Sequence, residues 1–336
     1  MLVFFLVISS LCNAGKSHGG VIKTVIILYM FSTVLAAVIA VFASMAFPVK
    51  MTLANAATDT SAPQGIVEVL NNLLLNVVAN PVSSLVNANY VGILMWAVLL
   101  GLAFRAADKM TKKVLADVAD GISMVVTWII NLAPFGIFGL VFNTVSTNGL
   151  DIFTTYGKLL LLLVGCMLFI YFVTNPLLVY WCIRQNPYPL IFHCLKRSAL
   201  TAFFTRSSAA NIPVNMKVCE EMGLDRDTYS VTIPLGATIN MDGAAITITV
   251  MTMATAFTLG IHVDIPTAII LSLLAALSAC GASGVAGGSL LLIPMACSLF
   301  GISDDISMQV VAVGFIIGVV QDSVETALNS SSDLLL

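Results

Sequence analysis

The stretch that decides the fold is Ser230–Ile246, which reads SVTIPLGATINMDGAAI and lies in an apolar run. The run is long enough to cross the roughly 30 Å hydrocarbon core of a bilayer. Asn240 and Asp242 nevertheless stand in its middle, beside Gly236 and Gly243. A carboxylate at the centre of a membrane helix costs about 2.5–3.5 kcal/mol, so it normally faces a partner, a cavity or an ion. The glycines favour a broken helix with a cation site at the bilayer midplane, and a kink with a buried, paired aspartate is the alternative.

The composition is that of a polytopic α-helical membrane protein. Of the 336 residues, 59% are hydrophobic and 9% are charged, whereas soluble domains carry about 25% charged residues. The net charge of −3, without a basic patch that contains aromatics, gives no indication of nucleic acid as a partner. The seven cysteines form no C-x-x-C pair, and we interpret them as small apolar side chains. The lipid bilayer is therefore the expected environment.

The N-terminal residues 1–14 fit two interpretations. Leu2–Ile8 resembles the apolar region of a signal peptide, but the positively charged start of such a peptide is missing. We prefer the other interpretation, in which residues 1–20 are the remnant of an early membrane helix.

Interrupted segments in the second half of the chain form an internal repeat. Residues 188–222 and 266–300 each consist of two short apolar runs joined by a tip of small or polar residues, Thr205–Asn211 in the first and Gly281–Ser289 in the second. This arrangement predicts re-entrant hairpins. Each is followed by a long helix, the broken helix 228–259 or the last helix 305–336. Such corresponding segments mark the binding site of secondary transporters. Continuous helices are expected at 21–47, 90–104, 121–145 and 159–183, with an amphipathic segment at 66–79.

The distribution of Lys and Arg predicts the orientation. Basic residues gather at 16–23, 105–113, 184–197 and 217–226, whereas the intervening polar segments carry only Lys50 and Lys158. The positive-inside rule places the first group in the cytoplasm. The first hairpin then enters from the cytoplasm and the second from outside, which makes an inverted pair.

The last helix carries a polar stripe. Asp322, Thr326, Asn329 and Asp333 follow the spacing i, i+4, i+7 and i+11, and Glu325 lies at the edge of the same face. In so apolar a chain, a buried pathway is a better explanation than a solvated helix face.

These residues suggest an ion site and a substrate site close together. Asp322 is suited to pair the ammonium of a zwitterionic substrate. The N–H groups of a hairpin tip near Ser207 and Ser208 are suited to its carboxylate, because helix N-termini favour anions. Hard oxygen ligands suit Na⁺ rather than a transition metal. The oxygen ligands available are those of Gly236, Asn240, Asn329 and Asp333.

Four ordered motifs carry a family resemblance. They are TRSSAANIP at Thr205–Pro213, GATINMDG at Gly236–Gly243, GASGVAGG at Gly281–Gly288, and the stripe from Asp322 to Asp333. Together they resemble the dicarboxylate/amino acid:cation symporter family, and among its members most closely the bacterial sodium/serine-threonine symporters. The likeness covers nearly the whole chain.

The resemblance implies an inverted-repeat elevator transporter that assembles as a homotrimer. Residues 21–47 and 146–336 would form the moving transport domain, and residues 48–145 would form scaffold helices and surface loops. A further helix and most of another would precede Leu11.

The resemblance also implies roles for individual residues. Asp322 would hold the substrate amino group, and Asn329 with the Ser207–Ser208 tip would hold the carboxylate. The tip Gly281–Gly288, with Gly284 and Val285, would be the extracellular gate, which closes over the substrate and a sodium ion bound by backbone carbonyls. One sodium site would comprise Gly236, Asn240, Asn329 and Asp333. A further sodium site would comprise Tyr29, Ser32, Thr33, Asn240 and Asp242.

Departures from the family pattern predict the substrate. Members that carry acidic substrates have an arginine where Glu325 stands and a threonine where Ala244 stands, and a proline is usual at Ala286. Without the arginine, a substrate side-chain carboxylate would be buried unpaired. We therefore expect sodium-coupled uptake of L-serine and L-threonine across the cell inner membrane, with Thr326 donating to the substrate hydroxyl. Sodium- or proton-coupled transport of acidic amino acids or dicarboxylates is the alternative.

Enzymatic and channel functions are the other rivals. Gly281–Gly284 matches the G-x-S-G motif of rhomboid-type intramembrane proteases, but no histidine follows His262 to activate Ser283. Asp242 and Asp322 lack the Gly-x-Gly-Asp motif of aspartyl intramembrane proteases. An ion channel is the stronger rival, because re-entrant loops also build selectivity filters. Saturable, sodium-dependent serine uptake distinguishes a symporter from a pore.

Overall fold

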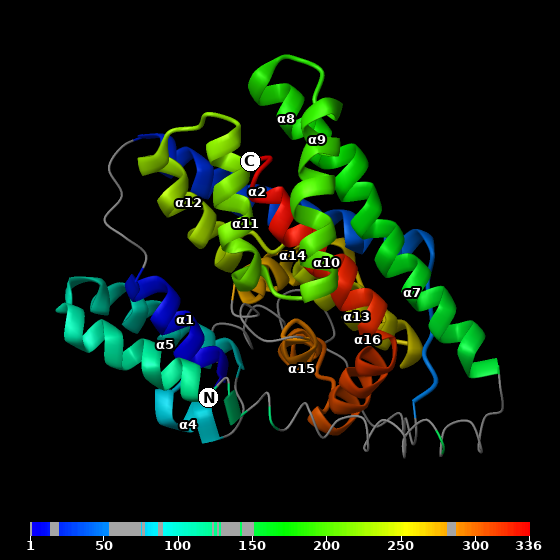
Figure 1. The fold of residues 1–336 in the computed structure, drawn as a ribbon. Coiled ribbons are helices and arrows are strands. Elements are labelled where there is room, and N and C mark those ends of the chain that lie inside the picture. The colour runs from blue at the N-terminus through cyan, green and yellow to red at the C-terminus, as the bar shows by residue number, and fades with distance from the viewer. Residues whose placement is uncertain are drawn as a thin grey trace.

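The protein is an α-helical, multi-pass membrane protein, as predicted. The computed structural model describes residues 2–13, 20–53, 75, 78–86, 90–122, 124–125, 128, 142, 151–280 and 287–336, and within these ranges it contains helices and no strand (Figure 1). The predicted helix at 121–145 and the amphipathic segment at 66–79 lie largely outside the described residues. Among the described residues, four helical stretches are long and apolar enough to cross a membrane: Lys23–Ala46, Tyr156–Ile183, Thr228–Thr258 and Asp304–Ser332.

The described helices pack around two hydrophobic cores. Helices α1 (Leu2–Asn13) and α5 (Tyr90–Ala103) pack against each other, with α4 (Pro81–Val86) beside α5. Their small core contains Val7 and Ala97. The larger core joins α2 (Gly20–Ala46) and α7 (Asp151–Phe169) with most of the helices from residue 188 onward. The candidate site residues belong to this second group.

One long helix contains a π-turn at a proline. Helix α7 continues through η2 (Ile170–Thr174), which has π geometry, into α8 (Asn175–Ile183). Pro176 has no N–H, and its ring would clash with the carbonyl four residues earlier in a regular α-helix. The wider π-turn directly before Asn175 and Pro176 relieves this conflict. The predicted helix at 159–183 therefore exists and begins earlier, at Asp151.

The segment 188–222 folds back on itself around a short tip. It comprises α9 (Tyr188–Cys194), η3 (Leu195–Ala199), α10 (Leu200–Thr205) and α11 (Ser208–Glu221), and α11 packs against both α10 and η3. The tip is only Arg206 and Ser207, which is shorter than the predicted Thr205–Asn211. The reason is that Ser207 caps α11 by accepting a hydrogen bond from the Ala210 N–H at 3.2 Å, so the helix begins immediately after it.

The predicted break in the helix around Asn240 is present. Helix α12 (Arg226–Ile239) ends at Asn240, and α13 (Asp242–Thr258) begins after Met241. Both linking residues leave the helical region, with φ/ψ of −91°/80° at Asn240 and −120°/52° at Met241. The freed Met241 N–H donates to Thr33 Oγ1 at 3.2 Å, so α2 supplies the partner that the interrupted helix lacks.

The last long helix lies at the centre of the large core. Helix α16 (Asp304–Ser332) packs against α7, α10, α13 and α15 (Figure 1), and it ends four residues earlier than the predicted 305–336. The segment before it comprises α14 (Ile265–Ala279), η4 (Leu290–Leu292) and α15 (Ile293–Ser298). The tip residues 281–286 between them lie outside the described residues.

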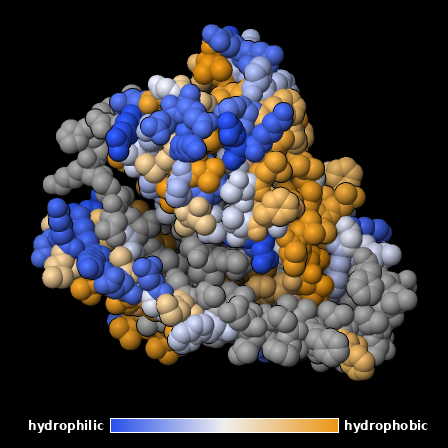
Figure 2. Space-filling model, in the orientation of Figure 1, coloured by the Kyte–Doolittle hydropathy of each residue, from blue (hydrophilic) through white to orange (hydrophobic). Residues whose placement is uncertain are grey.

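The surface is divided between apolar and polar regions. Figure 2 shows apolar side chains on the flank formed by α7 and α10, where Leu161, Phe169 and Phe204 are exposed. Hydrophilic residues gather over the turns that join α8 to α9 and α11 to α12. An exposed apolar flank suits helices that face the hydrocarbon core of a bilayer, and polar turns suit its aqueous side.

Candidate functional site

Helix α2 meets the broken helix at Asp242. Ser32 Oγ donates to Asp242 Oδ2 at 2.8 Å, and Thr33 Oγ1 donates to Asp242 Oδ1 at 3.2 Å. All three side chains are almost fully buried. Tyr29 lies one turn earlier on α2, and its carbonyl is 2.9 Å from Thr33 Oγ1. The structure thus brings together residues that the sequence placed in one sodium site.

The second group of predicted sodium ligands converges on Asp333, directly after α16. Asn240 Nδ2 donates to Asp333 Oδ1 at 3.0 Å, and Tyr29 Oη donates to the Asp333 carbonyl at 3.0 Å. Gly236 approaches so closely that an added Cβ would lie 2.6 Å from Asp333 Oδ1. Tyr29 and Asn240 therefore link this group to the one at Asp242.

Two oxygen atoms in this region are left without partners. Asn240 Oδ1 and Asp333 Oδ2 are buried and have no hydrogen-bond partner among the described residues. Buried polar atoms are normally paired, and a buried carboxylate is costly unless a charge or donors compensate it. A carboxylate oxygen and an amide oxygen are hard ligands suited to Na⁺. The donor set therefore fits the predicted ion.

Asn329 joins α16 to the start of α13. Its Oδ1 accepts the Gly243 N–H at 2.7 Å, which pairs one of the free donors at the helix N-terminus. The approach is close because Gly243 has no side chain: an added Cβ would lie 2.9 Å from Cα of Glu325. Asn329 is therefore held between the two elements that carry the predicted sodium ligands.

Asp322 contacts both hairpin segments. The Gly287 N–H donates to Asp322 Oδ1 at 3.2 Å, and the Arg206 guanidinium lies 3.9 Å from Asp322 Oδ2. The Asp322 side chain is 8% exposed, whereas that of Arg206 is 41% exposed. Arg206 adopts the left-handed conformation with φ of 50°, which is uncommon for a residue other than glycine. The sequence reasoning did not single out Arg206, although it lies beside Ser207 in the first motif.

The remaining predicted substrate residues lie close to these groups in the chain. Ser207 and Ser208 stand at the N-terminus of α11, and Thr326 is 6% exposed on α16, one turn after Asp322. Gly284 and Val285 lie outside the described residues.

A buried cluster around Glu325 was not predicted. Three donors converge on Glu325 Oε2: Thr247 Oγ1 at 2.7 Å, Ser289 Oγ at 2.9 Å and Gln321 Nε2 at 2.5 Å. They come from α13, from the residues before η4, and from α16 itself. The sequence feature that could have predicted this cluster is the i, i+4 spacing of Gln321 and Glu325 in an apolar helix.

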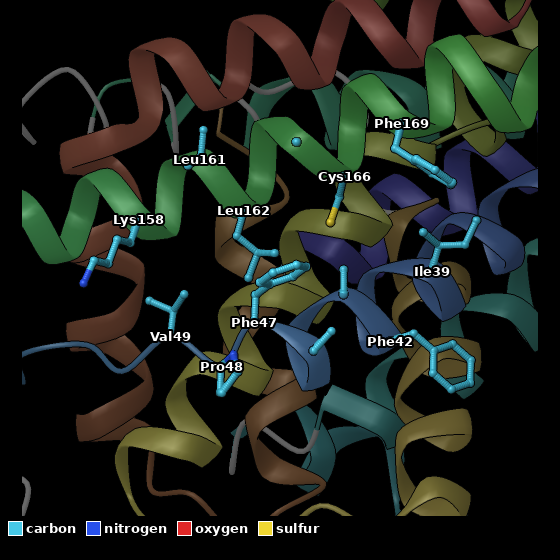
Figure 3. A pocket seen from close by; sticks show the side chains of 13 residues that line it. Ile39, Phe42, Phe47, Pro48, Val49, Lys158, Leu161, Leu162, Cys166 and Phe169 are labelled. Atoms are coloured by element: carbon cyan, nitrogen blue, oxygen red, sulfur yellow. The ribbon is translucent and has the colours of Figure 1, made fainter.

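A large cavity lies elsewhere, between α2 and α7. It has a volume of about 930 Å³, and Figure 3 shows Phe47, Leu162 and Phe169 among its lining side chains. Its walls are apolar apart from Lys158, and none of the candidate site residues lines it. An amino-acid zwitterion would lose the hydration of both charges there without gaining partners. The polar region between α2, α13 and α16 is therefore the better candidate site.

Comparison with known proteins agrees with this geometry. The model of the sodium:dicarboxylate symporter family matches residues 1–336. The chain is 61% identical to the serine/threonine transporter SstT of Bifidobacterium adolescentis over 335 residues, which cover 99% of this chain and 78% of the relative. Both matches are to transporters rather than enzymes. The chain belongs to the sodium:dicarboxylate symporter family.

Proposed function

We propose that the protein imports L-serine and L-threonine together with Na⁺. The family and the similar serine/threonine transporter support this function at the level of the whole chain. At the level of the site, the main support is the pair of unpartnered buried oxygens, Asn240 Oδ1 and Asp333 Oδ2. A bound cation gives both oxygen atoms a partner and compensates the negative charge of the Asp333 carboxylate. Ion binding therefore stabilises the folded arrangement of these residues.

Besides the sodium ion expected under the gate, two sodium sites in this proposal are built from described residues. The first site uses Asp333, Asn240, Asn329 and the carbonyl of Gly236, and the second uses Asp242 with Tyr29, Ser32, Thr33 and Asn240. Asn240 contributes to both, because it is the residue at the break between α12 and α13. A helix interrupted at this point offers carbonyl oxygens and a half-helix N-terminus inside the protein, as in other secondary transporters.

The substrate lies against Asp322 and the tip of the first hairpin. Its ammonium gives Asp322 the close counter-charge that Arg206, at 3.9 Å, supplies only in part. Its carboxylate is bound by the N-terminus of α11 near Ser207 and Ser208, with Asn329. Thr326 donates to the side-chain hydroxyl of serine or threonine.

The charges near the site disfavour an acidic substrate. Glu325 and Asp322 lie within one turn on α16, and the Arg206 guanidinium is already directed at Asp322. A second substrate carboxylate would face these acidic groups without a cation of its own. Dicarboxylates, which the family description names, are therefore the weaker alternative.

The proposed architecture is an inverted-repeat elevator in the cell inner membrane. The segments 188–222 and 266–300 serve as re-entrant hairpins, and the second closes over the substrate near Gly284 and Val285. The larger core, which unites α2 with the helices from α7 onward, supports assigning residues 21–47 and 146–336 to one moving transport domain. Residues 48–145 form scaffold, and the working assembly is a homotrimer.

Uptake of labelled serine into proteoliposomes tests the function. An inward Na⁺ gradient should drive saturable uptake that threonine inhibits and aspartate does not. Uptake that is equal in Na⁺ and in choline, or that aspartate inhibits as well as threonine does, would contradict the proposal. A conductance without bound substrate would instead favour a channel.

A further inference from the structure

A buried amide cluster joins the first hairpin segment to α16. It consists of Ser198 on η3, Asn211 and Asn215 on α11, and Ser330 on α16, all at most 1% exposed. Asn211 Nδ2 donates to Ser198 Oγ at 2.9 Å and to Ser330 Oγ at 2.8 Å. Asn215 Nδ2 donates to the Ser330 carbonyl at 2.7 Å, and Ser198 Oγ donates to Asn215 Oδ1 at 2.5 Å. Neither asparagine belongs to the sites proposed above.

The cluster lies between the two functional regions along the chain. Asn211 stands in the first turn of α11, three residues after Ser208 and four after the capping residue Ser207. Ser330 follows Asn329, and they precede Asp333 by three and four residues respectively, which is about one helical turn. A displacement of the α11 N-terminus would therefore act on the backbone of the segment that carries the sodium ligands.

The segment that contains these ligands is also held on its other side. Asn240 Nδ2 donates to Ser332 Oγ at 2.8 Å, and the Gly243 N–H donates to Asn329 Oδ1 at 2.7 Å. Residues 329–333 are thus tied to the helix break through Asn329 and Ser332, and to the first hairpin through Ser330. Residues 329–333 therefore have little freedom to follow a movement of the first hairpin without also changing their contacts with the helix break.

We propose that Asn211 and Asn215 are positioning residues that couple the substrate-binding tip at Ser207–Ser208 to the sodium ligands Asn329 and Asp333. The proposal rests on the function proposed above. The two amides hold Ser330 where the neighbouring ligands converge, without touching ion or substrate. Neutral amides suit this task in a membrane protein, because they make several hydrogen bonds and carry no charge that must be desolvated.

A purely structural role makes a different prediction. If the cluster only holds helices together, its loss lowers the stability of the protein and leaves the sodium dependence unchanged. If it couples the two regions, its loss weakens sodium binding in protein that remains folded. Allosteric couplings typically amount to about 5- to 150-fold in affinity, so a substantial change in sodium dependence is expected.

The test uses Asn215→Leu, which removes the side-chain amide with little change in shape, and Ser330→Ala, which removes one hydroxyl and keeps the carbonyl. Serine uptake is measured across a range of Na⁺ concentrations, and the melting temperature of the purified protein is measured across the same range. The control is Asn186→Ala, because Asn186 is exposed and its Oδ1 accepts a hydrogen bond within its own turn, from the Tyr188 N–H at 3.1 Å.

We expect Asn215→Leu to raise the Na⁺ concentration for half-maximal uptake at least fivefold, and Ser330→Ala to raise it less. The maximal rate at saturating Na⁺ should change less than threefold, and Asn186→Ala should match the wild type. Combining Asn211→Leu with Ser330→Ala should give less than the sum of the separate effects, because the two side chains share a hydrogen bond.

The outcomes separate the two proposals. Variants that melt at lower temperature but keep the wild-type sodium midpoint overturn the coupling and leave the proposed function intact. A wild-type protein that Na⁺ does not stabilise contradicts the sodium sites themselves. If Asn215→Leu does not fold, the sodium midpoint of Ser330→Ala decides the question.

Discussion

Replacing Gly236 with alanine tests the first sodium site with a single methyl group. The added Cβ would lie 2.6 Å from Asp333 Oδ1, 2.8 Å from Asp333 Cγ and 3.1 Å from Tyr29 Cε2. Carbon and oxygen atoms ordinarily approach no closer than about 3.4 Å. Either α12 or the Asp333 carboxylate must therefore move by several tenths of an ångström.

The magnitude follows from the cost of overpacking. Extra methyl groups in a packed interior cost about 1–3 kcal/mol. If that cost falls on the sodium-bound arrangement, the dissociation constant for Na⁺ rises by about 5- to 150-fold, since each 1.4 kcal/mol is a factor of ten. The backbone carbonyl of residue 236 is retained in the variant. The change therefore tests the effect of displacing Asp333 without removing a sodium ligand.

The assay is the sodium dependence of serine uptake in proteoliposomes, with Gly318→Ala as the matched control. Gly318 lies on α16, the helix that leads to Asp333, and an added Cβ there would meet no heavy atom of the described residues within 4 Å. Gly318→Ala should leave the sodium midpoint unchanged. If Gly236→Ala also leaves it unchanged, the assignment of Gly236 and Asp333 to one ion site is refuted.

Further perturbations address the other groups of the site. Asp322→Asn should abolish serine uptake, because the substrate ammonium loses its counter-charge; uptake with unchanged serine affinity would refute this. Asp333→Asn should raise the Na⁺ concentration for half-maximal uptake, and an unaltered sodium dependence would count against its role as a ligand. Glu325→Leu leaves three buried donors without their acceptor, at a cost of about 1–3 kcal/mol each. It should therefore lower the melting temperature far more than Glu325→Gln, which retains an acceptor. Equal melting temperatures of the two variants would show that the cluster contributes little to stability. Na⁺ at 100 times its dissociation constant should stabilise the purified protein by about 2.7 kcal/mol, and K⁺ producing the same rise in melting temperature would contradict sodium selectivity.

The sequence predicted features in which polar residues interrupt an apolar pattern. The break at Asn240 and the stripe from Asp322 to Asp333 could be located because membrane segments tolerate such residues only for a reason. The convergence of Ser32, Thr33 and Asp242 could not be derived from spacing, since α2 and α13 are separated by about 200 residues, and it came from the family resemblance.

Other features depend on pairings that no local pattern contains. The Glu325 cluster draws its donors from α13, α16 and the segment before η4, so each donor alone looks like an isolated polar residue. The tip at Arg206–Ser207 was predicted too long because one capping hydrogen bond decides where α11 begins. The early end of α16 at Ser332 likewise escaped prediction, since neither glycine nor proline follows it and residues 334–336 are leucines.

Coupling between sodium and serine is the central claim, and the reverse flux tests it most directly. Proteoliposomes are prepared with equal Na⁺ on both sides, and an inward gradient of serine is imposed while radioactive sodium is followed. In a symporter, the inward serine gradient must drive net entry of sodium although sodium itself has no gradient. Asp322→Asn must abolish that entry. Serine entry without net sodium movement would contradict the account.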